Sequence, residues 1–286
     1  MLWFFYSLIC AFSLSILDAL CKELLQKENT LLVSLIRWGY SLPFLFLFFL
    51  FIKVPPLDRT FWTTVTVLVP LEITSVILYM RGIQISPLSL SIPFFALTPV
   101  FMIGVAYLVL GEVPDRSGVA GILLVALGAY ITNIDSLRKG WAGPLRAITR
   151  ERGVMLIIVV AVIYSVTGVL GKVAVLHSSP EFFGVFYIPL LTLVLFPVSA
   201  AREGRGVLRI FNNFPRFLLL GFFSALMVIT HFLAVRLVDV AYMISVKRLS
   251  LVFSVILGRM FFHEEYFAQR LAGSLVMLLG VVLIIL

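Results

Sequence analysis

Apolar stretches of about 20 residues recur from one end of the 286-residue sequence to the other. Each is long enough for a helix to cross the roughly 30 Å hydrocarbon core of a bilayer. The stretches are continuously apolar, whereas the strands of a membrane barrel alternate between apolar and polar residues. Hydrophobic residues make up 62% of the sequence and charged residues 13%, about half the charged share of a typical soluble domain. The sequence therefore predicts an all-α integral membrane protein.

Ten transmembrane helices can be placed on these stretches. They cover residues 2–21, 31–52, 61–80, 87–110, 117–134, 154–176, 182–200, 217–237, 240–262 and 266–286. Short turns near 85–87 and 238–239 predict two tight antiparallel helical hairpins. The longest connection, 135–153, carries six Arg, Lys or Trp residues, among them Trp141. Such a composition is typical of a basic segment that lies at the membrane surface.

This connection divides the sequence into two similar halves, a first repeat at 1–134 and a second at 154–286. The motifs Gly111-Glu112, Ala120-Gly121 and Gly128 recur 152 residues later as His263-Glu264, Ala272-Gly273 and Gly280. Ser15 and Lys22 recur 150 residues later as Ser165 and Lys172. Because each half holds an odd number of spans, we expect the second repeat to be inverted relative to the first. Inverted repeats are typical of alternating-access transporters, with the substrate site at mid-membrane between the repeats.

These paired features resemble the EamA-type transporters of the drug/metabolite transporter superfamily over essentially the whole chain. The resemblance depends on the five-plus-five spans, on Lys22 and Lys172 near the end of the first helix of each half, and on Glu112 and Glu264 after the fourth. It implies a ten-helix fold that moves small metabolites, often amino acids or related compounds, commonly outward and without ATP. The stretch Ser245-Val246-Lys247-Arg248 is also similar to the ninth helix of the triose-phosphate translocators. In those proteins a Lys-Arg pair holds the substrate phosphate.

Lys247 and Arg248 are adjacent cations about two turns inside the apolar stretch 240–262. Each costs on the order of 2.5–3.5 kcal/mol on insertion scales, so we expect them to face a wet cavity or a partner. His231 and Lys247 each lie eight residues from Asp239 in the predicted turn, which places them at the same depth, about 12 Å from the turn. The three side chains predict a cationic pocket for a phosphate or carboxylate. Alternatively, the pair neutralises an internal acid, or one cation reaches the interface.

The 152-residue offset makes Tyr79 and Phe95 the counterparts of His231 and Lys247. The predicted pocket is therefore basic on one side and aromatic on the other. Glu72 precedes Tyr79 by seven residues, which places both on one helix face near the middle of a span. Two interpretations of Glu72 remain open: a carboxylate that binds a coupling proton, or a fixed partner of Lys247 or Lys172.

The remaining charged residues inside or beside the spans lie nearer to helix ends. Asp18 and Lys22 are four residues apart and can pair on one helix face, whereas Lys172 has no such built-in partner. Lys172 can therefore meet a substrate or Glu72, unless it extends to the interface. We expect Arg37 to reach the lipid headgroups. The predicted substrate-binding residues are Lys247, Arg248, His231, Tyr79, Phe95, Lys172 and Lys22, and the predicted coupling or charge-pairing residues are Glu72 and Asp18.

A membrane-embedded enzyme and a non-transporting scaffold are the competing classes. The sequence has no His-Glu-x-x-His, Gly-x-Ser-x-Gly or Gly-rich phosphate motif, and His177, His231 and His263 lack ligand spacing. We therefore expect no catalysis, no metal and no cofactor, and a scaffold has no need for charges inside the membrane.

The net charge of +8 lies in short loops, which indicates membrane topology rather than nucleic-acid binding. The expected partners are a small-molecule substrate, the lipid bilayer and a coupling proton, for a monomer or homodimer that spans the cell membrane several times.

The orientation of the termini is left open by two conflicting indications. The loops on the side of the termini hold Lys53, Arg59, Arg116 and Arg236, and the loops on the opposite side hold many more cations. Because cytoplasmic loops carry the excess of Lys and Arg, this distribution predicts that both termini lie outside the cytoplasm. The family resemblance implies that both lie inside, although the superfamily contains members of either orientation.

Overall fold

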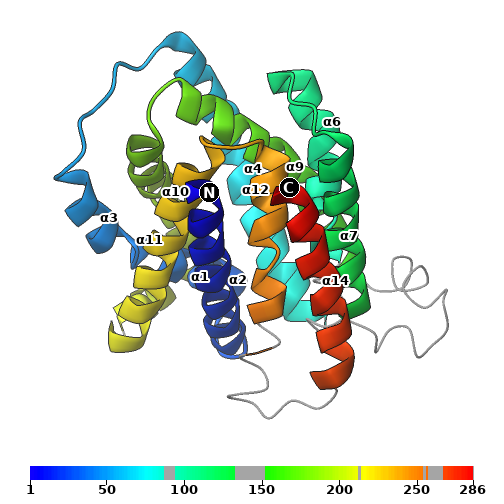
Figure 1. Cartoon of the computed structure of the whole chain (residues 1–286). Helices are drawn as coiled ribbons and strands as arrows, with labels where there is room; N and C mark the ends of the chain where they lie inside the picture. Colours follow the sequence, from blue (N-terminus) through cyan, green and yellow to red (C-terminus); the bar gives the residue numbers. More distant parts are fainter. Residues whose placement is uncertain (87–93, 133–151, 212–213, 254–255, 257–266, 286) are drawn as a thin grey trace.

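The computed structural model describes residues 1–286 except 87–93, 133–151, 212–213, 254–255, 257–266 and 286. Within these residues the chain forms helices and no strand, and most of the long helices run side by side in one bundle (Figure 1). The α-helices are α1 (Leu2–Leu25), α2 (Thr30–Gly39), α3 (Leu42–Phe49), α4 (Arg59–Ile85), α6 (Thr98–Leu110), α7 (Arg116–Thr132), α9 (Arg152–Leu176), α10 (Pro180–Glu203), α11 (Phe214–Val235), α12 (Val240–Lys247) and α14 (Phe267–Ile285). A 3-10 helix, η2, covers Gly204–Phe211.

Six of the described helical segments are long and apolar enough to cross a membrane. They are Leu2–Leu25, Thr30–Phe49, Arg59–Ile85, Arg152–Leu176, Pro180–Arg202 and Phe214–Val235, and shorter apolar helices cover Thr98–Leu110, Arg116–Ile131 and Ala272–Ile285. Leu108 and Leu193 are 82% and 72% exposed on the outside of the bundle, as expected for side chains in contact with lipid tails. The all-helical membrane fold is thus confirmed. Parts of the predicted fourth and ninth spans, and most of the linker 135–153 with Trp141, lie outside the described residues.

Polar side chains in the loops fix where several helices begin. Oδ1 of Asn29 accepts a hydrogen bond from the backbone N–H of Leu32 at 2.9 Å, and Oδ1 of Asp58 accepts one from Phe61 at 2.8 Å. Such N-caps satisfy donors that have no partner inside the helix. These caps therefore set the loop-to-helix boundaries of α2 and α4.

The helices pack in pairs that relate the two halves of the chain. α4 packs along α9, and α1 packs along α11. Because α1 corresponds to α9 and α4 to α11, these two contacts are counterparts. α7 contacts α14, its own counterpart, and α6 contacts α12, which belongs to the equivalent span of the second repeat. This pairing is what two repeats related by a two-fold axis produce.

The repeated glycines lie where α7 crosses α14. A Cβ atom on Gly121 would come within 2.5 Å of the carbonyl oxygen of Gly280, and one on Gly280 within 2.6 Å of the oxygen of Gly121. A Cβ atom on Gly128 would come within 2.7 Å of the oxygen of Gly273. The residue order is therefore opposite in the two helices, which run antiparallel at a backbone-to-backbone contact. Glycine permits this close approach, and Gly121 and Gly128 belong to the motifs that recur in the two halves.

Three spans that the sequence predicts as continuous are interrupted. In the span 31–52 the regular helix is interrupted by a turn at Tyr40 and Ser41, whose backbones stay in the right-handed α region. The Ser41 hydroxyl donates to the carbonyl of Trp38 at 2.6 Å, and Pro43 lies in the first turn of α3, where its missing N–H costs least. The predicted span is confirmed as an apolar helical segment over Thr30–Phe49, with this local irregularity inside it.

The other two interruptions occupy equivalent positions in the two repeats. Ahead of α6, the N–H of Leu97 bonds the carbonyl of Phe94, and after α12 the N–H of Leu249 bonds that of Val246. Leu97 and Leu249 are 152 residues apart, so the same break occurs in both halves. Pro99 follows the first break, but no proline or glycine explains the second. Discontinuous helices of this kind build substrate sites in transporters.

Candidate functional site

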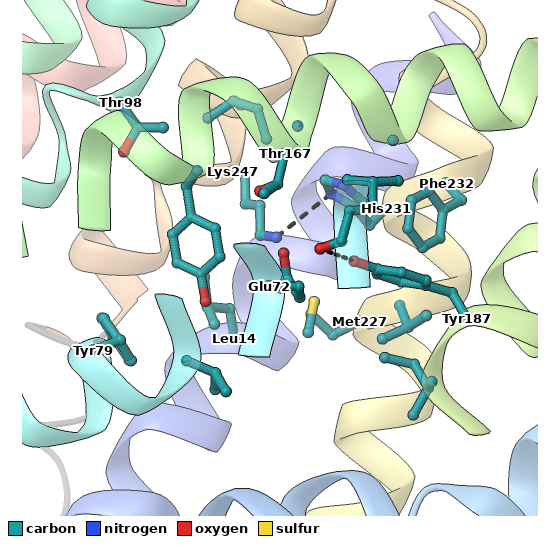
Figure 2. A pocket seen from close by; sticks show the side chains of 18 of the residues that line it. Leu14, Glu72, Tyr79, Thr98, Thr167, Tyr187, Met227, His231, Phe232 and Lys247 are labelled. Atoms are coloured by element: carbon teal, nitrogen blue, oxygen red, sulfur yellow. Dashed lines mark hydrogen bonds between the residues drawn. The ribbon is translucent and has the colours of Figure 1, made fainter. Parts of the chain in front are cut away.

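A cavity of about 140 Å³ lies between the two repeats. Its walls come from α1, α2, α4 and α6 of the first repeat and from α9, α10, α11 and α12 of the second, with residues from both helix breaks. Figure 2 shows Thr98 and Tyr79 on one side, Tyr187 and Phe232 on the other, and Lys247, Glu72 and His231 between them. Among the described residues that line it, the cations are Arg37, Lys247 and Arg248, and the acid is Glu72.

Lys247 and His231 occupy one part of this cavity. Nζ of Lys247 lies 3.4 Å from Nδ1 of His231, the contact dashed in Figure 2. The prediction that these residues share one depth on the hairpin is therefore confirmed. Glu72 lies in the same part of the cavity, close to the hydroxyl of Thr167 and within electrostatic range of Lys247. A cation, an imidazole and a carboxylate thus meet at mid-helix.

A second part of the cavity combines aromatic rings with Arg248. The ring of Phe95 lies 5.2 Å from that of Tyr79 and 5.5 Å from that of Tyr164, measured between centroids. The guanidinium carbon of Arg248 lies 3.8 Å from the centroid of Phe95, a cation–π contact. Tyr79 and Phe95 line the cavity opposite the residues of α12. Asp18 lies just behind this wall, with Tyr79 within hydrogen-bonding reach.

Arg37 also lines the cavity, and its predicted contact with the headgroups is wrong. α2 is buried along nearly its whole length, from Leu31 to Trp38, because it packs between α10, α11 and α4. The side chain of Arg37 is therefore enclosed by protein and only 8% exposed. Its position near the start of an apolar stretch suggested the membrane surface. The pattern of one helix carries no information about which neighbours surround that helix.

Lys172 and Lys22 are not among the residues that line the cavity. Nζ of Lys172 forms an ion pair with Glu112 and donates to the carbonyl of Val238 at 2.7 Å. Its amine is therefore committed to Glu112, which leaves Lys247 as the cation near Glu72. Lys22 is exposed on α1. Glu264 and His263, predicted as counterparts of Glu112 and Gly111, lie outside the described residues.

Contacts between the two repeats tie together the end of the bundle at which α6 and α9 end. Oε2 of Glu112 accepts a hydrogen bond from the N–H of Val240 at 3.1 Å, so the carboxylate binds both Lys172 and the start of α12. The hydroxyl of Tyr242 lies 3.0 Å from Oδ1 of Asp115. Glu112 thus both caps the start of α12 and pairs with Lys172.

A third contact at this end joins Asp58 and His177. Nδ1 of His177 lies 2.6 Å from Oδ2 of Asp58. The backbone N–H of Phe61 and the neighbouring His177 hold the pKa of Asp58 below its usual value. The N–H of Gly118, with Tyr242, lowers the pKa of Asp115 in the same way. Both carboxylates are therefore ionised acceptors at neutral pH.

The arrangement can bind a small polar molecule. Within the described part of the chain, no group of three His, Cys, Asp or Glu side chains could hold a metal ion. The fold and the cavity together define a helical membrane protein of two related halves with a polar site enclosed between them.

Comparison with known proteins identifies the family. The EamA-like transporter family matches residues 1–134 and 151–286. The chain belongs to this family, within the drug/metabolite transporter superfamily, and is therefore a multi-pass membrane protein of a family of small-molecule transporters. A solved chain described only as "Crystal structure of protein" shares 14% sequence identity and superposes with a TM-score of 0.75. The alignment covers 99% of this chain and 94% of that one, a likeness in fold alone. No curated protein matches the sequence.

Proposed function

We propose that this protein is a secondary transporter of the cell membrane that exports a small anionic or amino-acid-like metabolite by alternating access. The observation that carries the proposal is the cavity between the repeats, in which three cations face one carboxylate. Charges at this depth are costly unless a substrate, a partner or water compensates them. An excess of positive charge favours a substrate with at least one negative group.

The size of the cavity supports a small substrate. A volume of about 140 Å³ corresponds to about five water molecules, at the roughly 30 Å³ that each occupies in the liquid. A metabolite of only a few non-hydrogen atoms fills the same space. Larger compounds require the walls to move apart.

Alternating access would use the features that the two repeats share. The contacts around Glu112, Asp115 and Asp58 close one end, so opening that end requires the Glu112–Lys172 pair to separate. The equivalent helix breaks before α6 and after α12 place flexible joints at the cavity itself. Rocking of the α4–α6 and α11–α12 segments around these joints would expose the cavity to each side in turn.

Glu72 is the candidate carrier of a coupling proton. It faces the cavity beside Thr167 and within range of Lys247, and the described residues form no ion pair with it within 4 Å. A carboxylate that is not fixed in an ion pair can release and rebind a proton during each cycle. Net direction would then follow the substrate gradient or the proton gradient.

The test is transport by purified protein in liposomes. Wild-type liposomes loaded with a mixture of amino acids, organic acids and sugar phosphates should lose particular compounds, identified by mass spectrometry. Lys247→Gln should reduce this loss at least about tenfold, whereas Arg81→Gln, at an exposed arginine bonded to Gln84, should not. Equal loss from liposomes with and without protein would contradict the proposal.

The same assay tests proton coupling with a second variant. Glu72→Gln should abolish uphill accumulation driven by a pH gradient while exchange down a substrate gradient continues. Accumulation that still follows the pH gradient in this variant would exclude Glu72 as the coupling group.

Exchange of a phosphate-bearing metabolite is the second candidate function. It is favoured by the adjacency of Lys247 and Arg248 at the cavity wall, since Lys and Arg together suit phosphate. The same loaded liposomes decide between the two. Preferential loss of sugar phosphates, in exchange for external phosphate, would favour the exchanger.

A further inference from the structure

Two cavity arginines from different repeats are both buried, and each has an Nε without a hydrogen-bond partner. Arg37 of α2 is 8% exposed, and Arg248 at the end of α12 is 4% exposed. Nε of each is buried and has no hydrogen-bond partner in the structure. A buried guanidinium donor without a partner is costly. Both side chains line the cavity, so their guanidinium groups can meet a molecule that binds there.

The two arginines lie close to the same groups. Asp18, Tyr79 and Tyr164 are among the residues that interact electrostatically with Arg37, and all three also interact with Arg248. Arg248 in addition stacks on Phe95. Both guanidinium groups therefore lie within electrostatic range of Tyr79 and Tyr164 of the aromatic wall that Phe95 completes.

Lys247 lies within electrostatic range of both arginines. Cys10 of α1 interacts with Lys247, Arg248 and Arg37 alike, and Leu14 of the same helix lines the cavity. The two arginines therefore share one cavity with Lys247, His231 and Glu72.

The described charged groups in and behind the cavity do not balance. Arg37, Arg248 and Lys247 face two carboxylates, Glu72 and Asp18. Asp18 does not line the cavity, and its Oδ1 is buried without a hydrogen-bond partner. The formal charge of these five groups is therefore +1 when both carboxylates are ionised. A singly charged carboxylate neutralises it, whereas a phosphate dianion would reverse it.

We propose that Arg37 and Arg248 form a two-arginine clamp, one arginine from each repeat, that binds a carboxylate group of the substrate. The proposal rests on the proposed function and deepens it, since it names an organic acid as the substrate class and Arg37 as a specificity-determining residue. Planar guanidinium groups pair with planar carboxylates through two parallel hydrogen bonds. The aromatic wall keeps Arg248 oriented by stacking. Because the clamp joins the repeats, a bound carboxylate also couples their movement.

The experiment uses sodium acetate as the probe and the full-length protein in detergent. The melting temperature of the wild type should rise with acetate at constant ionic strength, relative to chloride. Arg37→Gln should weaken the apparent acetate affinity at least about tenfold, equivalent to 1.4 kcal/mol. Arg37→Lys keeps the positive charge but loses the paired N–H donors of the guanidinium. Its acetate affinity should therefore lie between those of the wild type and Arg37→Gln. Arg81→Gln, at the exposed arginine bonded to Gln84, should match the wild type.

Three results would overturn the clamp. They are the absence of acetate stabilisation in the wild type, equal stabilisation of the wild type and Arg37→Gln, and greater stabilisation by phosphate than by acetate at matched ionic strength. A structural role of Arg37 alone would lower the melting temperature of Arg37→Gln without changing its acetate dependence.

A second measurement needs no variant and covers the case in which Arg37→Gln does not fold. Phenylglyoxal modification of the wild type, followed by peptide mass spectrometry, should be slowed several-fold by acetate at Arg37 and Arg248 but not at Arg81. Unchanged rates at Arg37 would again overturn the clamp. If liposome transport requires Lys247 but the acetate response does not depend on Arg37, the clamp is excluded. The proposed function would then still stand.

Discussion

At the residue scale, the most consequential contact outside the cavity is the ion pair between Glu112 and Lys172. Their side chains are 14% and 9% exposed, so removal of one partner leaves a largely buried charge. Such losses typically cost about 3–5 kcal/mol. We predict that Glu112→Gln and Lys172→Gln each lower the melting temperature clearly, and that the double variant loses less than the sum of the two, with a coupling energy of at least about 1 kcal/mol.

The matched control for this pair is the contact between Glu23 and Arg216. Nη2 of Arg216 lies 2.5 Å from Oε2 of Glu23, and the two side chains are 44% and 46% exposed. Exposed pairs contribute about 0–1 kcal/mol, so Glu23→Gln should change the melting temperature little. Additive effects of Glu112→Gln and Lys172→Gln would show that the pair does not act as a unit.

The sequence predicted some residue positions in the site and missed others for a clear physical reason. His231 and Lys247 could be placed together because a tight turn fixes their depth, and Tyr79 and Phe95 followed from the repeat offset. Arg37 and Lys172 could not be placed in this way. Their environment depends on which helices surround α2 and the end of α9, and the sequence of a single span does not specify its neighbours.

At the element scale, the α7–α14 crossing depends on the absence of side chains. A Cβ atom on Gly128 would lie 2.5 Å from the backbone nitrogen of Met277, whereas one on Gly104 of α6 would meet no atom within 4 Å. Gly128→Ala must separate two backbones, at a typical cost of about 1–3 kcal/mol. Gly104→Ala should instead stabilise the helix by up to about 1 kcal/mol. Melting temperatures should therefore shift in opposite directions, and a fall for both variants would contradict this account.

Helix positions were the more predictable part of the fold, and helix continuity the less predictable part. Apolar length placed α1, α4, α9, α10 and α11 to within a few residues, because bilayer thickness imposes that length. The breaks at Tyr40–Ser41, Leu97 and Leu249 were missed. The apolar stretches continue on both sides of them, and the break at Leu249 has no proline or glycine. Tertiary contacts with the opposite repeat are needed to hold such a break.

At the scale of the whole molecule, the two termini and the contacts around Glu112 lie toward the same end. Figure 1 shows α1 leading away from the N-terminus and α14 leading to the C-terminus, so both termini lie toward one end of the bundle. The α6–α7 connection, which follows Glu112, is at this end too. We call the end of the bundle that is held by the contacts of Glu112, Asp115 and Asp58 the tied end. The orientation of the termini therefore also decides which side of the membrane the tied end faces.

The charge distribution predicts that this end faces away from the cytoplasm. Its loops carry Lys53, Arg59, Arg116 and Arg236, against eleven Lys and Arg residues on the other side, and cytoplasmic loops hold the excess of positive charge. Val54→Cys, at a residue 60% exposed on the terminal side, should react with a membrane-impermeant maleimide on intact cells. Lys27→Cys, on the opposite side, should react only after permeabilisation. Cys10 and Cys21 are fully buried and should contribute little background.

The reverse labelling pattern would place both termini in the cytoplasm, as the family resemblance implies. The tied end would then be the cytoplasmic end, and an exporter would have to break the Glu112–Lys172 pair to load its substrate. With the predicted orientation, the same pair breaks when substrate is released outside. In that case Glu112→Gln should accelerate efflux from liposomes into which the protein is inserted in one known direction. The labelling result thus determines which step of the cycle this ion pair controls.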